Sequence, residues 1–442
     1  MPADLIIEPA WERTDEGSAA ERACFAELRI AVGQTTLSEG YDAFVNRLRA
    51  GPLVSAYHAA EWFAWNWWRL RWEPRTTRID WPFAHQMATI GEGYLWPNVT
   101  VQSDGVRIVL IAKPSVRADS KPFRFICDRA AIIPAAAFEA GVDTFIAQVL
   151  DRLTTEQVGQ TNLHALWRDL KAERDDPMVA LRRRLEALIG AEPDAVSDSE
   201  QDLSSAANLN DLMAGVADWG VEPIAELAAH EGKQGHRIAL SRLWEQATAV
   251  GQSAGPSDAV HLTDPSVLPR FGEVAAWRRG AAAAQALRKQ ERLGTAPIAN
   301  RRLEEMAGAR DGTVADRNTT GELPFSIETG TPSIVLRSKW REGRRFELAR
   351  LLGDRLAGPS ADPLRPATRA YTYRQKMQRS FAAELLSPFD KVEHMLGGDL
   401  SDERQEEVAR YFKVSERTIR TLLVNHGLLD RDELDETFDL VA

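Results

Sequence analysis

The sequence lacks several features that define large classes of proteins. It has two cysteines, Cys24 and Cys127, too few for a disulfide framework or a cysteine-rich zinc site. It contains no uncharged apolar stretch of about 18 residues, so we predict no transmembrane helix. Met1 to Asp4 lack the basic, apolar and small-residue regions of a signal peptide. We therefore expect a protein of the reducing cytoplasm with no membrane partner.

The charge balance argues against a general affinity for nucleic acid. The net charge is −11, from 54 Lys and Arg against 65 Asp and Glu. Most non-specific binding to nucleic acid comes from neutralising phosphates, so any such contact must be local. The apolar share (44%) and the charged share (27%) are normal for a globular protein, and 442 residues predict two or three domains.

Two polar stretches are candidate domain boundaries. Residues 191–207 are acidic and polar and indicate a linker or long loop, and residues 251–268 are rich in Gly, Ser, Pro and Asp. We therefore predict a Trp-rich mixed α/β domain (1–155), a helical connector (156–264) and a C-terminal domain (265–442). The expected fold class is α+β and mostly helical.

Residue periodicity predicts most of the individual elements. Residues 99–112 have the pattern of a β-hairpin with its turn at Asp104-Gly105, residues 123–133 indicate a further strand, and residues 134–153 have helical spacing. In the C-terminal domain we expect helices over 274–293 and 303–308, strands over 324–327 and 333–336, and then helices broken at 358–359 and 387–388.

Two motifs of the C-terminal domain occur in the order found in a known peptidase family. Residues 345–354 read Arg-Phe-Glu-Leu-Ala-Arg-Leu-Leu-Gly-Asp, and residues 381–388 read Phe-Ala-Ala-Glu-Leu-Leu-Ser-Pro. Residues 268–430 thereby resemble the ImmA/IrrE zinc peptidases. In that family a helix and two strands precede a His-Glu-x-x-His helix, and a metal-binding carboxylate lies just before the Phe-Ala-Ala run. The resemblance implies a zincin-like fold.

The residues that carry the family's chemistry are absent. Arg350 replaces the first His, Leu351 the Glu and Asp354 the second His; no Asp or Glu occurs between Asp362 and Glu384. A guanidinium cannot ligate zinc, and an isobutyl group cannot act as a base. We therefore predict a degenerate domain with no metal, no other cofactor and no zinc-protease activity. Arg350 and Asp354 are either a helix-surface ion pair at i, i+4 or part of a repurposed pocket for an anionic or polar ligand.

The end of the chain resembles a helix-turn-helix from Glu406 to Leu429. Ala409, Val414 and Ile419 have core spacing, and Ser415 is placed to cap the second helix. Arg417 and Arg420 are candidate contacts to DNA. The alternative is that this segment belongs to the ImmA/IrrE-like fold itself, and its acidic flanks oppose DNA.

Seven of the 13 tryptophans fall between residues 62 and 96, in an otherwise acidic chain whose residues 41–125 are mildly basic. Aromatic side chains beside arginines suit stacking against bases or sugars. The candidate acid–base residues are Asp80, His85 and Glu92, and the candidate ligand contacts are Trp81, Tyr94, Trp96 and Asn98. The alternative is that the tryptophans fill a core and that His85 is a packed residue.

These patterns support one leading hypothesis and two alternatives. The leading hypothesis is a bacterial stress-response or phage-defence protein whose inactive ImmA/IrrE-like domain senses or scaffolds, because relatives commonly act in such settings. An alternative is a nucleic-acid-acting enzyme, for example a base-processing glycosylase, with its site in the Trp-rich domain. The third is a helix-turn-helix repressor. The candidate partners are thus DNA or another protein.

Overall fold

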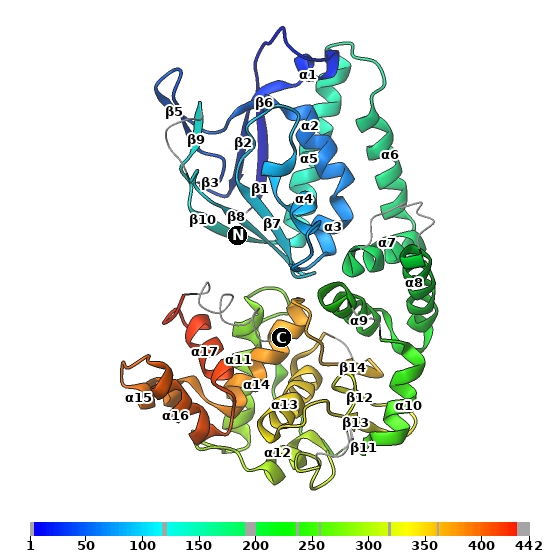
Figure 1. Ribbon diagram of the computed structural model, residues 1–442, viewed down its shortest axis with the longest axis vertical. Coiled ribbons are helices and arrows are strands. Elements are labelled where there is room, and N and C mark those ends of the chain that lie inside the picture. Colours follow the sequence, from blue (N-terminus) through cyan, green and yellow to red (C-terminus); the bar gives the residue numbers. More distant parts are fainter. Residues whose placement is uncertain are drawn as a thin grey trace. The chain divides into compact units, whose positions relative to one another are not determined.

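The computed structural model describes residues 4–116, 122–190, 200–235, 238–255, 258–316, 320–359 and 362–430 (Figure 1). The chain divides into two compact units. The N-terminal unit comprises Met1–Leu209 with Glu231–Gly235, and the C-terminal unit comprises Asn210–His230 with His236–Ala442. Helices hold 51% of the residues and strands 15%, and the named strands of the described ranges pair antiparallel. The fold class is therefore α+β and mostly helical, as predicted.

Three small sheets form the framework of the N-terminal unit. In the first, β2 pairs with β1, β3 and β6; the second has the order β10-β8-β7 and the third β5-β4-β9. The strands are β1 (Leu5–Trp11), β2 (Phe25–Val32), β3 (Thr35–Thr36), β4 (Gly40–Asp42), β5 (Arg47–Arg49), β6 (Leu53–Ser55), β7 (Val99–Ser103), β8 (Arg107–Ala112), β9 (Phe123–Phe125) and β10 (Arg129–Pro134).

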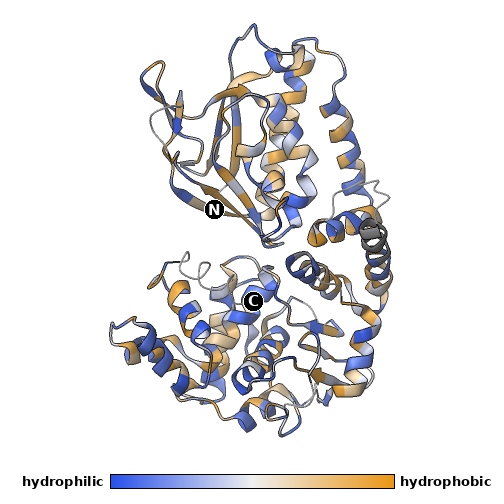
Figure 2. Ribbon diagram, viewed as in Figure 1, coloured by the Kyte–Doolittle hydropathy of each residue, from blue (hydrophilic) through white to orange (hydrophobic). Residues whose placement is uncertain are grey.

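The predicted hairpin at Asp104-Gly105 is confirmed, because β7 and β8 pair across it with Val101 opposite Leu110. The single strand expected over residues 123–133 is instead two strands: β9 pairs with β4, and β10 pairs with β8. Strands β8 and β10 are mostly hydrophobic (Figure 2).

Helix α5 (Ala135–Thr155) covers the first sheet and fills much of the core of this unit, as its spacing predicted. Phe138, Val142 and Phe145 on this helix are fully buried. Gly141 lets α5 approach β1 closely, since a Cβ there would lie 2.7 Å from the Leu5 carbonyl oxygen. The other helices of the unit are α1 (Ala19–Ala23), α2 (Ala56–Trp65), α3 (Trp67–Trp72), α4 (Trp81–His85), α6 (Asn162–Asp175), α7 (Pro177–Ile189) and the 3₁₀ helix η1 (Met87–Thr89).

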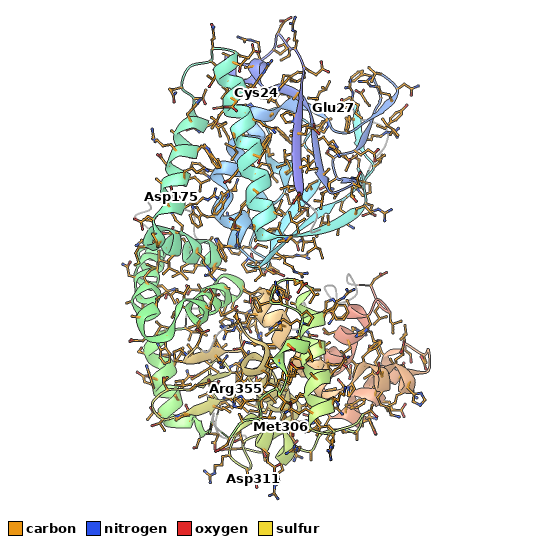
Figure 3. The ribbon with its side chains drawn as sticks, turned by 180° about the vertical axis from the view of Figure 1, so that it is seen from behind. Cys24, Glu27, Asp175, Met306, Asp311 and Arg355 are labelled. Atoms are coloured by element: carbon orange, nitrogen blue, oxygen red, sulfur yellow. The ribbon has the colours of Figure 1, made fainter. Side chains whose placement is uncertain are left out.

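Buried groups in this core include most of the clustered tryptophans and both cysteines. The indoles that are at most 8% exposed are Trp62, Trp67, Trp68, Trp81 and Trp96, whereas Trp65 is 64% exposed. The thiols are free, and burial raises the pKa of Cys24 (labelled in Figure 3) to about 12. Most of the indoles are thus core residues.

The boundary between the units falls in the section predicted to be a helical connector. Helix α8 (Glu200–Trp219) and helix α9 (Val221–Gln234) each contribute residues to both units, and α10 (Leu240–Val250) follows. Part of the predicted linker, residues 200–207, is therefore helical, and residues 191–199 lie outside the described residues. None of the described helices is long and apolar enough to cross a membrane.

The C-terminal unit combines one four-stranded sheet, of order β11-β13-β12-β14, with packed helices. Arg355, labelled in Figure 3, and Arg365 of β14 both pair with Glu328, at 2.9 and 2.8 Å. The elements are β11 (Gln252–Ser253), η2 (Pro265–Val267), α11 (Ala276–Gln290), α12 (Asn300–Ala307), β12 (Phe325–Ile327), β13 (Ser333–Val335), α13 (Arg341–Ala357), β14 (Leu364–Pro366), α14 (Tyr373–Leu386), α15 (Phe389–Leu396), α16 (Asp402–Phe412) and α17 (Glu416–Asn425).

Helices α13 and α14, which carry the two motifs, pack against each other. The contact requires a glycine at position 353, because a Cβ there would lie 2.4 Å from the Phe381 ring. Helix α11 packs on the same helix α14, where a Cβ on Gly280 would lie 2.4 Å from the Met377 carbonyl oxygen. Gly353 and Gly280 thus allow α13 and α11 each to approach α14 closely.

Candidate functional site

Arg350 reaches from α13 to α14 and to the chain before it. Its Nη2 donates to the carbonyl oxygen of Thr368 at 2.7 Å, to Oε1 of Gln375 at 2.5 Å and to Oε1 of Gln378 at 3.2 Å. Its side chain is 7% exposed, and its Nε has no hydrogen-bond partner among the described residues. Burial, together with the charge of Arg379, lowers the pKa of Arg350 to about 9, so it stays charged at neutral pH.

Asp354 lies one turn further along α13 and is fully buried. Its carboxylate accepts two hydrogen bonds from Arg374 of α14, at 2.7 and 2.6 Å, and a longer one from Arg365 at 3.4 Å. Burial alone would raise the pKa of this carboxyl, but the charge and hydrogen bonds of Arg374 and the charge of Arg365 lower it to about 2. The interpretation of Arg350 and Asp354 as a surface ion pair is therefore wrong. Both are buried, and each has its own partners.

A cavity of about 170 Å³ opens beside Arg350. We call it the arginine pocket, after the three arginines Arg337, Arg350 and Arg369 that line it. Glu347 lines it too, and its Oε2 accepts backbone N–H groups of Arg337 at 2.9 Å and Ser338 at 3.0 Å. The remaining lining residues are His230, Leu323, Pro324, Ser338, Gly343, Phe346 and Ala367.

Further arginines lie around this pocket. Burial and the charges of Arg337 and Arg417 lower the pKa of Arg369. Burial lowers the pKa of Arg379, on α14, to about 10, and Arg417 contributes to this shift. Four guanidinium groups besides that of Arg350 therefore lie near the pocket, and the carboxylates of Glu347, Asp354 and Glu226 also act on Arg350. The excess of guanidinium groups favours an anion in the pocket.

Glu226, on helix α9, lies close to the same network. It accepts a hydrogen bond from Thr372 Oγ1 at 2.8 Å and is 5% exposed. Burial raises the pKa of this carboxyl to about 7, against the lowering effect of Arg374. Across the described residues, no three His, Cys, Asp or Glu side chains come together in a way that could hold a metal ion.

In the N-terminal unit, Asp80 and His85 belong to one charge network, in which His85 is buried and Asp80 is partly exposed. His85 is fully buried; its Nε2 lies 3.0 Å from Oε2 of Glu73 and its Nδ1 lies 2.9 Å from the Val101 carbonyl oxygen. Arg69 donates to both Glu73 and Asp80. Both ring nitrogens of His85 face acceptors, and neither is open to a substrate. The hydrogen bonds and charges of Arg78 and Arg69 outweigh burial and lower the pKa of Asp80, which makes it a poor base.

Glu92 does not join Asp80 and His85. It lines a different cavity, of about 260 Å³, together with His58, Glu61, Trp62 and Trp65. We call this cavity the His58 pocket. Nε2 of His58 lies 3.0 Å from Glu21 Oε1. Burial lowers the pKa of His58, but hydrogen bonds with Glu61 and Glu21 and the charges of Glu21 and Glu92 outweigh it and raise this pKa. The structure thus brings Glu92 to two tryptophans, with acidic neighbours that sequence analysis missed.

Of the four predicted ligand contacts of the Trp-rich segment, Tyr94 and Trp96 contact each other, with ring centroids 5.9 Å apart. Trp81 stacks on His85, with ring centroids 4.1 Å apart, inside the core. Trp96 is buried and donates from Nε1 to the Gly91 carbonyl oxygen at 2.8 Å. Tyr94 is half-buried with its ring 6.1 Å from that of His58, and half-buried Asn98 precedes β7.

At the C-terminal end, α16 and α17 form the predicted helix pair. Ala409, Val414 and Ile419 are buried, and the Ser415 side chain accepts the N–H of Thr418 as the cap of α17. Arg420 donates to Asp402 of α16. Arg417 is exposed on α17, near enough to Arg369 and Arg379 for its charge to affect their pKa values. Of the two predicted DNA contacts, Arg420 is thus bonded within the helix pair, and Arg417 lies near the arginines of the arginine pocket.

Comparisons of this chain with protein-family models, with curated proteins and with solved structures found no match. The resemblance of residues 268–430 to ImmA/IrrE peptidases therefore stays a prediction from the two motifs and their order.

Proposed function

We propose that the C-terminal unit is a non-proteolytic ImmA/IrrE-like domain that binds a ligand or partner and acts as a sensor or scaffold. The observation that carries the proposal is the buried network that Arg350 and Asp354 form between α13 and α14. The resemblance implies that these two residues occupy the motif positions of the metal-binding histidines. Arginine has no lone pair for a metal, and Leu351 offers no base. The network leaves a pocket suited to binding rather than to hydrolysis.

The setting we propose is bacterial stress response or phage defence. A phage-challenge assay tests it with cells carrying the wild type, Arg350→Gln or the matched control Arg341→Gln, which removes an exposed guanidinium from the same helix. We expect protection to be lost with Arg350→Gln and kept with Arg341→Gln. Full protection by a folded Arg350→Gln protein would contradict the proposal.

The second candidate is a nucleic-acid-acting enzyme that uses the N-terminal unit. The observation that favours it is the position of Glu92 beside Trp62 and Trp65 in the His58 pocket, since base-processing enzymes stack an extruded nucleotide on aromatic side chains. The carboxylate of Glu61 in this pocket, and that of Glu21 beside His58, oppose a phosphate backbone. A Glu92→Gln variant in the phage-challenge assay tests this candidate. Loss of protection by a folded variant supports the enzyme hypothesis, and unchanged protection rejects it.

A further inference from the structure

The arginine pocket contains an arginine with unused hydrogen-bonding capacity. Arg350 is 7% exposed. Its Nη2 makes three hydrogen bonds, whereas its Nε has no hydrogen-bond partner among the described residues. A buried donor without a partner is costly, at about 1–3 kcal/mol. This Nε is itself buried, so the case for a ligand depends on the charged side chains that line the cavity.

The charged side chains that line the pocket indicate the sign and the net charge of its ligand. Three guanidinium groups, those of Arg337, Arg350 and Arg369, face one carboxylate, that of Glu347. Among the described residues, no carboxylate forms an ion pair with the guanidinium of Arg337 or of Arg369. The charges of these side chains sum to about +2, which matches a dianion better than a monoanion.

We infer that the arginine pocket binds a small phosphomonoester, with its dianion facing Arg350, Arg337 and Arg369 and its organic group against Phe346 and Pro324. This inference rests on the proposed sensing function and names its ligand class. Arginine recognises phosphate through several N–H donors in one plane.

The cavity favours a small ligand over a polymer. Its volume of about 170 Å³ is below the roughly 300–1,000 Å³ of pockets for drug-sized molecules. It accommodates a phosphate group with a few carbon atoms. A phosphodiester in a nucleic-acid backbone carries one charge per phosphate and would leave the pocket under-neutralised.

Isothermal titration calorimetry on the full chain tests the inference. The probes are glycerol 3-phosphate, inorganic phosphate and glycerol, with sodium chloride at matched ionic strength, and DNA oligonucleotides with a 5′-phosphate or a 5′-hydroxyl. We expect one glycerol 3-phosphate per chain and no binding of glycerol. Arg337→Gln and Arg369→Gln, both at exposed positions, should each weaken binding about tenfold or more, and Arg341→Gln should leave it unchanged.

Three outcomes overturn the inference: no heat from either small phosphate, binding that survives both pocket variants, or binding restricted to the 5′-phosphorylated DNA. Zinc content of the same preparations separates this failure from failure of the proposed function. If the protein contains no zinc and does not bind phosphates, only the inferred ligand class is rejected. If it contains one zinc per chain, the proposed function itself is rejected.

Discussion

Neutralising Asp354 should destabilise the C-terminal unit strongly. Asp354→Asn keeps the shape of the side chain but removes the charge that faces Arg374, which is 3% exposed, and Arg365. Breaking a buried ion pair by removing one partner costs about 3–5 kcal/mol, because the other charge stays buried. Asp362 still lies 3.2 Å from Arg374 in the variant, so we expect the lower end of that range, about 3 kcal/mol.

Calorimetric unfolding of the full chain measures this cost. For a unit of this size, about 3 kcal/mol lowers the Tm of its transition by roughly 6–12 °C. The matched control is Glu305→Gln, which breaks the exposed pairs with Arg301 and Arg302 on α12 and should change stability by under about 1 kcal/mol. The reasoning is refuted if the two variants unfold at the same temperature.

The same variant has a defined pH signature. The pKa of Asp354 lies at about 2 in the folded chain, below its ordinary value of 3.8. The stability that this carboxylate contributes is therefore present above about pH 4 and is lost as the pH falls towards 2. The lost contribution amounts to about 2 kcal/mol. Asp354→Asn should remove that part of the acid sensitivity, which urea titrations at pH 2, 3 and 5 would detect as a flatter profile.

Three further predictions concern other parts of the chain. The pKa of Glu226 is raised to about 7 from 4.5, so the stability of the wild type should fall as the pH rises through that interval. In urea titrations, Glu226→Gln should abolish this fall and be more stable than the wild type by up to about 3 kcal/mol at pH 8. A pH profile that the substitution leaves unchanged would contradict the raised pKa. Glu73→Gln removes a fully buried carboxylate and should lower the free energy of unfolding by about 3 kcal/mol. Asp80→Asn, at a side chain that is 28% exposed, should lower it by under about 1 kcal/mol. Equal melting temperatures of the two variants would contradict this ranking. Gly353→Ala should lower stability by about 1–3 kcal/mol, since the new methyl group meets the Phe381 ring, and an undisturbed melting temperature would mean that the helices are further apart.

Local sequence signals predicted much of the fold. The Asp-Gly turn and the alternation around it identified the β7–β8 hairpin, and the spacing of apolar residues identified α5. Strand β14 was missed because its three residues, Leu364–Pro366, are too short for a pattern and include a proline. The helical start of α8 was missed because residues 200–207 have a polar composition typical of linkers.

The candidate site was predicted only in part, because its residues come from separate elements. Sequence analysis singled out Arg350 and Asp354 from the motif, but their spacing on one helix favoured a mutual pair. Their actual partners lie on α14 and in the segment before it. Arg337 and Arg369 follow β13 and β14 respectively, and no motif connects them with Arg350. Only the tertiary packing brings these three guanidinium groups to one cavity.

The proposed function requires that no metal ion is held between α13 and α14, where guanidinium and carboxylate groups lie. Inductively coupled plasma mass spectrometry of the purified full chain, equilibrated with excess zinc and then dialysed, tests it most directly. We predict well under one zinc per chain, with the same value for Asp354→Asn. One tightly held zinc per chain that is lost on mutation of Asp354 would contradict the account.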